Sequence, residues 1–333
     1  MQERSKFAMY WASACGGCEI ALLGIHEELL DFATVFEPVF WPCVMDGKRS
    51  DVEALSDGAI ALTFFNGAIR NDDDVAMARL LRAKSRLLVA FGSCAYEGCI
   101  PGLSNLSSAR DHAASIYLEN PSTDNPYSIT PRVTTTVDEG ELHLPSFHDT
   151  VKSLRQTVDV DYSVPGCPPE PHQIQTVIDM VMKGGNLPPK GSVIGAGAKA
   201  LCEECPRLRR EKRVRKLYRL HEIIPDKENC LIDQGMVCMG PATRSGCTAL
   251  CPKAGMPCIG CYGPAEGVID QGAAMLSALA SIVEVDIEGN GDDAISRQIE
   301  DALNSLLDPA GTFYKFSLAH SLLQRARHPF RGD

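Results

Sequence analysis

The sequence predicts an α/β fold with a parallel sheet over the first half of the chain, followed by an irregular region with few helices. Short apolar segments alternate with amphipathic helical patterns in the first half, which is typical of parallel strands joined by helices. After the Gly- and Pro-rich stretch from Gly184 to Gly191, apolar periodicity weakens and cysteines become dense. We therefore expect two domains, residues 1–186 and 187–333.

The first elements repeat the order strand, loop, helix. Apolar runs predict three strands, at Lys6 to Ala12, Gly58 to Phe65 and Leu87 to Phe91. Glu19 to Phe32 carries apolar residues at near-helical spacing, which predicts one helix. A second helix is predicted to begin at a cap, Asn71 or Asp72, and to end at Lys84.

The same order continues up to the linker. Val133 to Leu144 predicts a hairpin that turns at Asp138, Glu139 and Gly140. Val158 to Val164 predicts a further strand, and Glu170 to Met182 a helix. An open parallel sheet of flavodoxin-like type accounts for this pattern.

The region after the linker is expected to be organised by metals rather than by an apolar core. Eight cysteines fall between Cys202 and Cys261 among Gly and Pro residues. Two helices are predicted near the end, at Gly267 to Val283 and Asp293 to Leu306. The tail from Phe313 to Arg331 is expected to be an extended wrapping segment.

The 14 cysteines are the anomaly in an otherwise ordinary composition of 333 residues, 44% hydrophobic and 23% charged. The N-terminus lacks an apolar signal core, and no apolar run approaches the ~18 residues of a membrane span. We therefore expect a cytoplasmic protein with no membrane span. Because disulfides are rare in a reducing cytosol, closely spaced cysteines indicate metal ligands. The net charge of -11 disfavours nucleic-acid binding and favours protein partners.

A first group of four cysteines lies in the α/β region. Cys15 and Cys18 form a Cys-x2-Cys pair, and Cys94 and Cys167 occur in FGSCAYEGC and VPGCPPEP. Cys15, Cys94 and Cys167 each come after an apolar strand, so a parallel sheet brings them to its carboxyl edge, where ligands of such sheets bind. The alternatives are a thioredoxin-like pair with two structural cysteines, or zinc.

Glycines and two further cysteines accompany this group. Glycines near the four thiols allow close backbone approach and amide hydrogen bonds to cluster sulfurs, at Gly16, Gly17, Gly92 and Gly166. Cys43 is predicted to be a buried thiol. Cys99 comes five residues after Cys94 but is expected not to be a ligand, because four thiolates are already available.

Eight cysteines form a second constellation. They are spaced as Cys202-x2-Cys205, Cys230, Cys238, and Cys247-x3-Cys251-x6-Cys258-x2-Cys261. Two four-thiolate sites account for all of them, and Pro206 and Pro252 follow cysteines as in bacterial ferredoxin-type motifs. Two zinc ribbons are the alternative for this region in isolation.

The motifs ACGGCE, GSCAYEGC and PGCPP resemble those of [NiFe] hydrogenase small subunits, and the resemblance covers nearly the whole chain. Within the family, the chain resembles the cytoplasmic methyl-viologen-reducing group associated with heterodisulfide reductase. The resemblance implies three 4Fe-4S clusters. The implied ligands are Cys15, Cys18, Cys94 and Cys167 for the proximal cluster; Cys202, Cys205, Cys230 and Cys238 for the distal cluster; and Cys247, Cys251, Cys258 and Cys261 for the medial cluster.

Two departures from exported members of the family point to this cytoplasmic group. Cys202 stands where those members have a histidine, and Cys251 adds a fourth thiolate to a site that holds a 3Fe-4S cluster in many of them. The closing segment FYKFSLAHSLLQR also resembles this group. The spacings around the cysteines leave open how Cys238 and Cys247 divide between the two sites.

The resemblance implies an electron-transfer function with no catalytic residue in this chain. Hydrogen would be split on a separate large subunit that carries the NiFe centre, and this chain would hold iron through its cysteines as one-electron carriers. An electron-accepting iron-sulfur or flavoprotein partner is implied, such as a heterodisulfide reductase complex. Glu19 either links hydrogen-bond networks to the large subunit or is a helix-start carboxylate favoured by the helix dipole.

A basic stretch interrupts the acidic chain. Pro206 to Leu220 contains eight Arg or Lys residues and one Glu directly after Cys205. It predicts either a docking surface for the electron acceptor or a solvated helix face.

Two other functions remain open on the residues alone. The first is a quinone-reductase subunit of the complex I type, although such chains usually carry one cluster and lack the extension from Cys202 to Cys261. The second is a zinc-stabilised scaffold without redox function.

Overall fold

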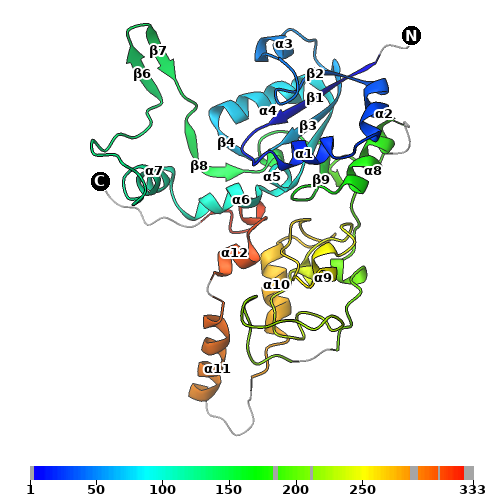
Figure 1. The fold of residues 1–333 in the computed structure, drawn as a ribbon, viewed down its shortest axis with the longest axis vertical. Coiled ribbons are helices and arrows are strands. Elements are labelled where there is room, and N and C mark those ends of the chain that lie inside the picture. The colour runs from blue at the N-terminus through cyan, green and yellow to red at the C-terminus, as the bar shows by residue number, and fades with distance from the viewer. Residues whose placement is uncertain (1–3, 183–186, 211–212, 286–291, 307, 326–333) are drawn as a thin grey trace. The chain divides into compact units, whose positions relative to one another are not determined.

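The computed structural model describes residues 4–182, 187–210, 213–285, 292–306 and 308–325 (Figure 1). The chain divides into two compact units, the first made of Met1–Ile194 and Leu318–Asp333, the second of Gly195–Ser317. Gly184 and Gly185 of the predicted linker lie outside the described residues.

The first unit is built on a six-stranded sheet whose neighbouring strands are all parallel. Its order is β10-β9-β5-β3-β1-β2. The strands are β1 Ser5–Trp11, β2 Phe36–Phe40, β3 Ile60–Asn66, β5 Ser85–Phe91, β9 Tyr162–Val164 and β10 Ser192–Val193. Chain order runs in opposite directions on the two sides of β1, so the switch point lies between β1 and β3. The predicted α/β fold of flavodoxin-like type is confirmed.

Helices cover both faces of the sheet. Successive strand residues point to opposite sides, and apolar residues on both sides need to be buried. Phe7 and Met9 of β1 belong to one apolar cluster, which also contains residues of α1 Gly17–Leu23, α2 Glu28–Val35 and α8 Pro171–Met182. Ala8 belongs to the other cluster, together with residues of α3 Arg49–Glu53 and α4 Asp72–Lys84. The central strands β1, β3 and β5 therefore bury side chains on both faces of the sheet.

A long excursion joins β5 to β9. It contains α5 Ser93–Glu97, α6 Cys99–Gly102, η1 Leu103–Leu106, α7 Ala109–Tyr117, the hairpin β6 Thr134–Val137 and β7 Gly140–His143, β8 Phe147–Lys152, and η2 Leu154–Gln156. The predicted hairpin is confirmed, with Val137 opposite Gly140. It extends away from the main sheet and its residues are exposed (Figure 1). β8 pairs instead with the short strand β4, Ile69–Asn71.

Several predicted elements have different limits in the structure. The single helix expected from Glu19 to Phe32 is wrong: α1 ends before Gly24 and α2 begins at Glu28, and His26 between them has a left-handed backbone, φ 54°. The strand predicted from Val158 to Val164 is shortened to β9. Asp161 interrupts its apolar run, and the carboxylate of Asp161 accepts a hydrogen bond from the Leu88 amide of β5. The helix capped by Asn71 is confirmed, since Asn71 accepts a hydrogen bond from the Asp74 amide.

The second unit has few regular elements. They are η3 Leu201–Glu203, η4 Gly240–Ala242, α9 Leu250–Lys253, α10 Gln271–Ala280, α11 Asp292–Asn304 and α12 Pro309–Phe313. Isolated bridges such as Leu208 with Asn229 and Tyr218 with Met236 connect its loops. The helix predicted from Gly267 starts later because Asp270 caps it, accepting from the Ala273 amide.

The final segment returns to the first unit at Leu318. The extended tail predicted from Phe313 is wrong for the described part, which holds turns and the short helix η5 Leu318–His320. Residues 326–331 of that prediction lie outside the described residues. None of the helices in the described ranges combines the length and the apolar character needed to cross a membrane.

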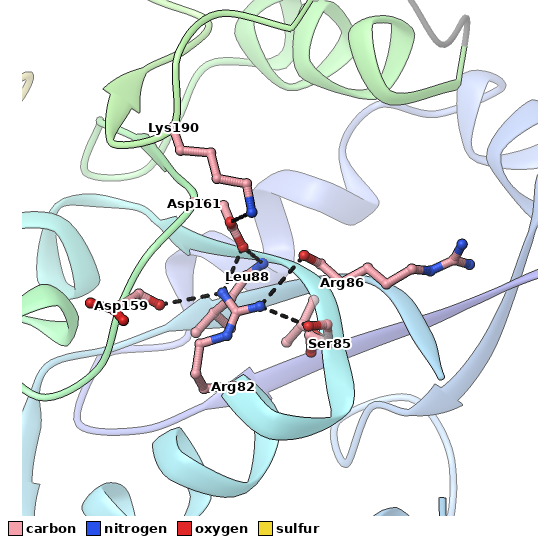
Figure 2. Close-up of polar contacts among 8 residues, drawn as sticks. Arg82, Ser85, Arg86, Leu88, Asp159, Asp161 and Lys190 are labelled. Carbon is pink, nitrogen blue, oxygen red and sulfur yellow. Dashed lines mark hydrogen bonds and ion pairs between the residues drawn. The ribbon is translucent and has the colours of Figure 1, made fainter. Parts of the chain in front are cut away.

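A buried carboxylate ties the sheet together at the edge where β5 begins (Figure 2). Asp161 accepts from Arg82 Nη1 at 2.6 Å and from the Leu88 amide at 2.8 Å, and it pairs with Lys190 Nζ at 2.5 Å. Burial opposes ionisation of Asp161, but the hydrogen bonds from Lys190 and Arg82 outweigh it and hold the pKa of this carboxyl below its usual value.

Replacing Asp161 by Asn should destabilise the first unit. Hydrogen bonds to charged groups contribute about 2 kcal/mol each, so a loss of this order is expected in the free energy of unfolding at neutral pH. Because the folded pKa is depressed, this stabilisation is present above the unfolded pKa near ~3.9 and is lost as the pH falls through the folded pKa.

Urea unfolding of the anaerobic protein at several pH values measures this effect. Asp159→Asn is the matched control, because the Asp159 side chain is exposed and only its main-chain carbonyl accepts from Arg82. The difference in free energy of unfolding between wild type and Asp161→Asn should become smaller below about pH 4. Equal unfolding midpoints of the two variants at neutral pH would show that the network contributes nothing.

Candidate functional site

The first group of cysteines lies beyond the carboxyl ends of three parallel strands. Cys15 follows β1, Cys94 lies in α5 directly after β5, and Cys167 follows β9. Cys18 is in the first turn of α1. Because parallel strands end at the same edge of the sheet, these thiols come from separate chain segments to one side of it. Cys18 and Cys94 are buried, whereas Cys15 and Cys167 are exposed.

Close backbone approach holds the loops of this group together. The Ser93 amide donates to the Gly166 carbonyl at 2.8 Å, and the Gly166 amide donates to Ser93 Oγ at 3.2 Å. Gly92 has φ +84°, and a Cβ there would lie 2.3 Å from Cys18 Sγ. Any larger residue at position 92 would therefore displace the Cys18 thiol.

Burial and the neighbouring thiols of the first group oppose the ionisation of Cys18. Burial raises the pKa of Cys18. The three other thiols of the group raise it further, in the order Cys94, Cys167, Cys15. Four sulfurs this close ionise together only where positive charge compensates them, as it does in a metal centre.

Cys99 is a fifth thiol beside this group. It is buried, with a left-handed backbone at φ 46°, and its thiol contacts Cys167 Sγ at 3.9 Å. The Cys99 thiol donates a hydrogen bond to Cys167, and this lowers the pKa of Cys167 to about 7 although burial raises it. That Cys99 is not itself a ligand stays a prediction.

Cys43 and Glu19 are the remaining residues that the sequence analysis singled out in the first unit. The prediction that Cys43 is buried is wrong: it lies in a turn after β2, where its neighbours Pro42 and Val44 are exposed as well. Glu19 lies in the first turn of α1, the position of a helix-start carboxylate. It is buried, its Oε2 accepts from Trp41 Nε1 at 2.6 Å, and burial raises its pKa.

In the second unit, one cavity is lined by Cys202, Cys205, Cys230 and Cys238. Apolar side chains, Gly240 and Arg207 complete its wall. Burial raises the pKa of Cys202 to about 12, and the other three thiols raise it as well. A Cβ on Gly240 would stand 3.3 Å from Cys202 Sγ and 3.6 Å from Cys238 Sγ. The structure thus groups Cys238 with the three cysteines that precede it.

The remaining four cysteines lie together in pairs. Burial raises the pKa of Cys247, and the nearby Cys251 raises it further. The pKa of Cys258 is raised first by burial and then by Cys238 of the preceding group, and Cys261 contributes in the same direction. Their assignment to one site therefore stays a prediction.

Hydrogen bonds connect the loops of the last two groups. The Cys258 amide donates to Cys238 Sγ at 3.2 Å, and the Met239 amide donates to the Cys258 carbonyl at 2.9 Å. Glu204 Oε1 accepts from the amides of Gly246 at 3.0 Å and Ala249 at 3.3 Å, which fixes the turn around Cys247. Glu204 was not predicted from the sequence, although its position between Cys202 and Cys205 was the available signal.

The donor set fits iron-sulfur clusters. Sulfur atoms are the ligands that such clusters use, and here main-chain amides donate to them, as the Cys258 amide does to Cys238. Glycines keep side chains out of the space beside Cys18 and Cys202. No three His, Cys, Asp or Glu side chains within the described ranges gather closely enough to hold a single metal ion.

Known proteins resemble the chain over most of its length. The family model described as NADH ubiquinone oxidoreductase, 20 Kd subunit, matches residues 15–181. The iron-sulfur subunit of the F420-non-reducing hydrogenase of Archaeoglobus profundus is 41% identical over 284 residues, 84% of this chain and 88% of the relative. The corresponding subunit of the F420-non-reducing hydrogenase of Methanothermobacter marburgensis is 34% identical over 326 residues, 97% of each chain.

A solved structure supports the fold. A chain of the Dm. baculatum [NiFeSe]-hydrogenase aligns with a TM-score of 0.51 at 18% identity, covering 79% of this chain and 95% of that chain. The sequence relatives are similar over both units of the chain and span most of their own length. The chain therefore belongs to the family of the NADH ubiquinone oxidoreductase 20 kDa subunit and, within it, to the hydrogenase subunits that include those of the F420-non-reducing hydrogenases.

Proposed function

We propose that this chain is the electron-transfer subunit of a cytoplasmic [NiFe] hydrogenase and connects hydrogen oxidation on a large subunit to an electron-accepting partner. The observation that carries the proposal is the gathering of thiols from distant segments, most clearly the four that line one cavity in the second unit. The naming of the relatives as hydrogenase subunits, one of them an iron-sulfur subunit, supports it.

Twelve thiolates would hold three 4Fe-4S clusters. The proximal ligands are Cys15, Cys18, Cys94 and Cys167; the distal ligands are Cys202, Cys205, Cys230 and Cys238; the medial ligands are Cys247, Cys251, Cys258 and Cys261. When bound, such clusters supply one-electron oxidation and reduction.

The protein's own contribution is to position sulfur atoms and to surround them with donors. The hydrogen bonds between Ser93 and Gly166 hold two segments of the proximal group next to each other. Amides such as that of Cys258 donate to sulfur, which favours the thiolate and raises the reduction potential of a bound cluster. No general acid, base or nucleophile of this chain is needed.

The large subunit would cover the proximal group. Cys15 and Cys167 are exposed in the isolated chain, and exposure of a low-potential centre to water and oxygen is a liability that a partner surface removes. Trp11 beside this group is 43% exposed and offers apolar area to such a partner.

The basic segment, Pro206 to Leu220, would bind the electron acceptor, such as a heterodisulfide reductase complex. Of the residues that the structure describes in it, Val214 and Leu217 are buried while Arg213, Lys216 and Arg219 are exposed. The alternative of a solvated helix is wrong for these residues, because the segment forms isolated bridges and no helix. An exposed cationic strip fits an acidic partner.

A complex I-like quinone-reductase subunit is the second candidate, because the matching family model carries that description. The match ends at residue 181, and the eight further cysteines all come after it. A zinc scaffold is the third alternative, and metal content separates it from both redox functions.

Anaerobically purified protein should contain roughly twelve irons and as much acid-labile sulfide per chain. Metal analysis of the co-purified complex measures this, and nickel should accompany the large subunit. About three zincs without sulfide would support the scaffold, and roughly four irons the complex I-like subunit.

Cys15→Ser should abolish hydrogen-dependent dye reduction by the assembled complex, because the proximal group loses one of its four ligands. Isotope exchange of hydrogen at the large subunit should be partly retained, and both rates are measured anaerobically. Cys43→Ser is the matched control, since Cys43 lies in none of the three groups and should leave both rates unchanged. Undiminished dye reduction by Cys15→Ser would contradict the proximal assignment.

Reversing charge in the basic segment should slow reduction of the protein acceptor. The double variant Arg213→Glu and Arg219→Glu is expected to lower that rate at least ~10-fold at low salt, with little effect on a small dye, because steering acts on charged partners. Arg79→Glu together with Arg110→Glu, exposed sites on helices of the first unit, gives the same charge change as a control. Equal losses in the two double variants would refute docking at this segment.

A further inference from the structure

Arg207 is half-buried and its guanidinium is held by main-chain carbonyls. Nε donates to the Pro252 carbonyl at 2.8 Å, and Nη1 donates to the carbonyls of Asp226 at 2.7 Å and Asn229 at 3.0 Å. A neutral carbonyl orients a guanidinium but does not cancel its charge. The side chain is thus fixed in place while its positive charge remains available to other groups.

The charge lies at the cavity of the second cysteine group. Arg207 lines this cavity together with Cys202, Cys205, Cys230 and Cys238. The exposed carboxylate of Asp226 is close enough for Arg207 to lower its pKa, but it is already engaged by the amides of Glu228 and Asn229 and by the Asn229 side chain. The four cysteines that line the same cavity would concentrate negative charge there as thiolate ligands.

The same side chain connects two cysteine groups. Pro252 follows Cys251, and Asn229 precedes Cys230, so the carbonyls that Arg207 binds belong to loops of different groups. The Cys258 amide bonded to Cys238 is a second connection between these groups. Arg207 therefore fixes both segments and is the cation in the described wall of this cavity. Arg209, which does not line the cavity, also interacts electrostatically with Cys202.

We infer that Arg207 is a positioning and potential-setting residue for the cluster bound by Cys202, Cys205, Cys230 and Cys238. Its charge favours the reduced, more negative form of the cluster and so raises the reduction potential. The inference rests on the proposed function, because it requires a redox-active group at these cysteines.

Redox titration of the anaerobic complex, followed by electron paramagnetic resonance, tests this role. The signal lost in Cys230→Ser identifies the cluster concerned. Arg207→Met keeps an unbranched apolar stem and removes the guanidinium with its charge. It should lower the ratio of reduced to oxidised cluster on the order of tenfold at a fixed potential, equivalent to about 59 mV for a one-electron couple.

Two variants separate charge from simple support. Arg207→Lys keeps the charge and should keep the potential near that of wild type, whereas a purely structural role predicts similar effects of Lys and Met. Arg79→Met removes an exposed charge from α4 of the first unit and should leave the potential unchanged.

The outcomes discriminate clearly. Full iron content with an unshifted potential in Arg207→Met overturns the inference. If Arg207→Met loses the cluster, Arg207→Lys decides: retention at the wild-type potential supports the charge role, and loss of the cluster overturns it. A wild-type complex without any iron-sulfur signal contradicts the proposed function itself, which is a different result from unshifted potentials.

Discussion

Electrostatic repulsion among closely placed cysteine sulfurs, once they ionise, is the constraint on which this structure depends. Burial and neighbouring sulfurs raise the pKa of Cys18 in one unit and of Cys202 in the other. Without a compensating positive charge, such cysteines have the lowest free energy as neutral thiols. When iron binds, the thiols lose their protons and become thiolate ligands. The proposed iron centres would supply most of the positive charge that such groups require, and Arg207 adds to it at the second group.

The two units meet this constraint in different ways. The first uses a parallel sheet, whose apolar core fixes the strand ends and so delivers Cys15, Cys94 and Cys167 to one edge. The second has no such sheet among its described residues, and its loops are fixed by isolated bridges, by Glu204 and by Arg207. The energy of metal binding is thus expected to contribute more to folding of the second unit than of the first.

The sequence was sufficient for the sheet and insufficient for its connections. Apolar runs identified β1, β3 and β5 because strands buried on both faces carry continuous hydrophobic sequence. The break at His26 escaped prediction because helical periodicity continues across it, while a left-handed residue interrupts the backbone. Cys43 was misplaced because an apolar neighbourhood in sequence, FWPCVMD, does not require burial in three dimensions.

For the candidate site, the spacing of cysteines predicted the groups but not the residues that tune them. Glu204 and Arg207 form hydrogen bonds with main-chain atoms of segments 19 to 45 positions away, contacts that no local pattern encodes. Cys99 could be noticed in the sequence, yet its contact with Cys167 depends on how α6 packs beside the loop after β9.

The central claim is that the twelve grouped thiols hold three one-electron centres, and anaerobic coulometric reduction of the isolated chain tests it most directly. We predict uptake of about three electrons per chain, with bleaching of the visible iron-sulfur absorption. Uptake of no electrons by a colourless protein would contradict the account.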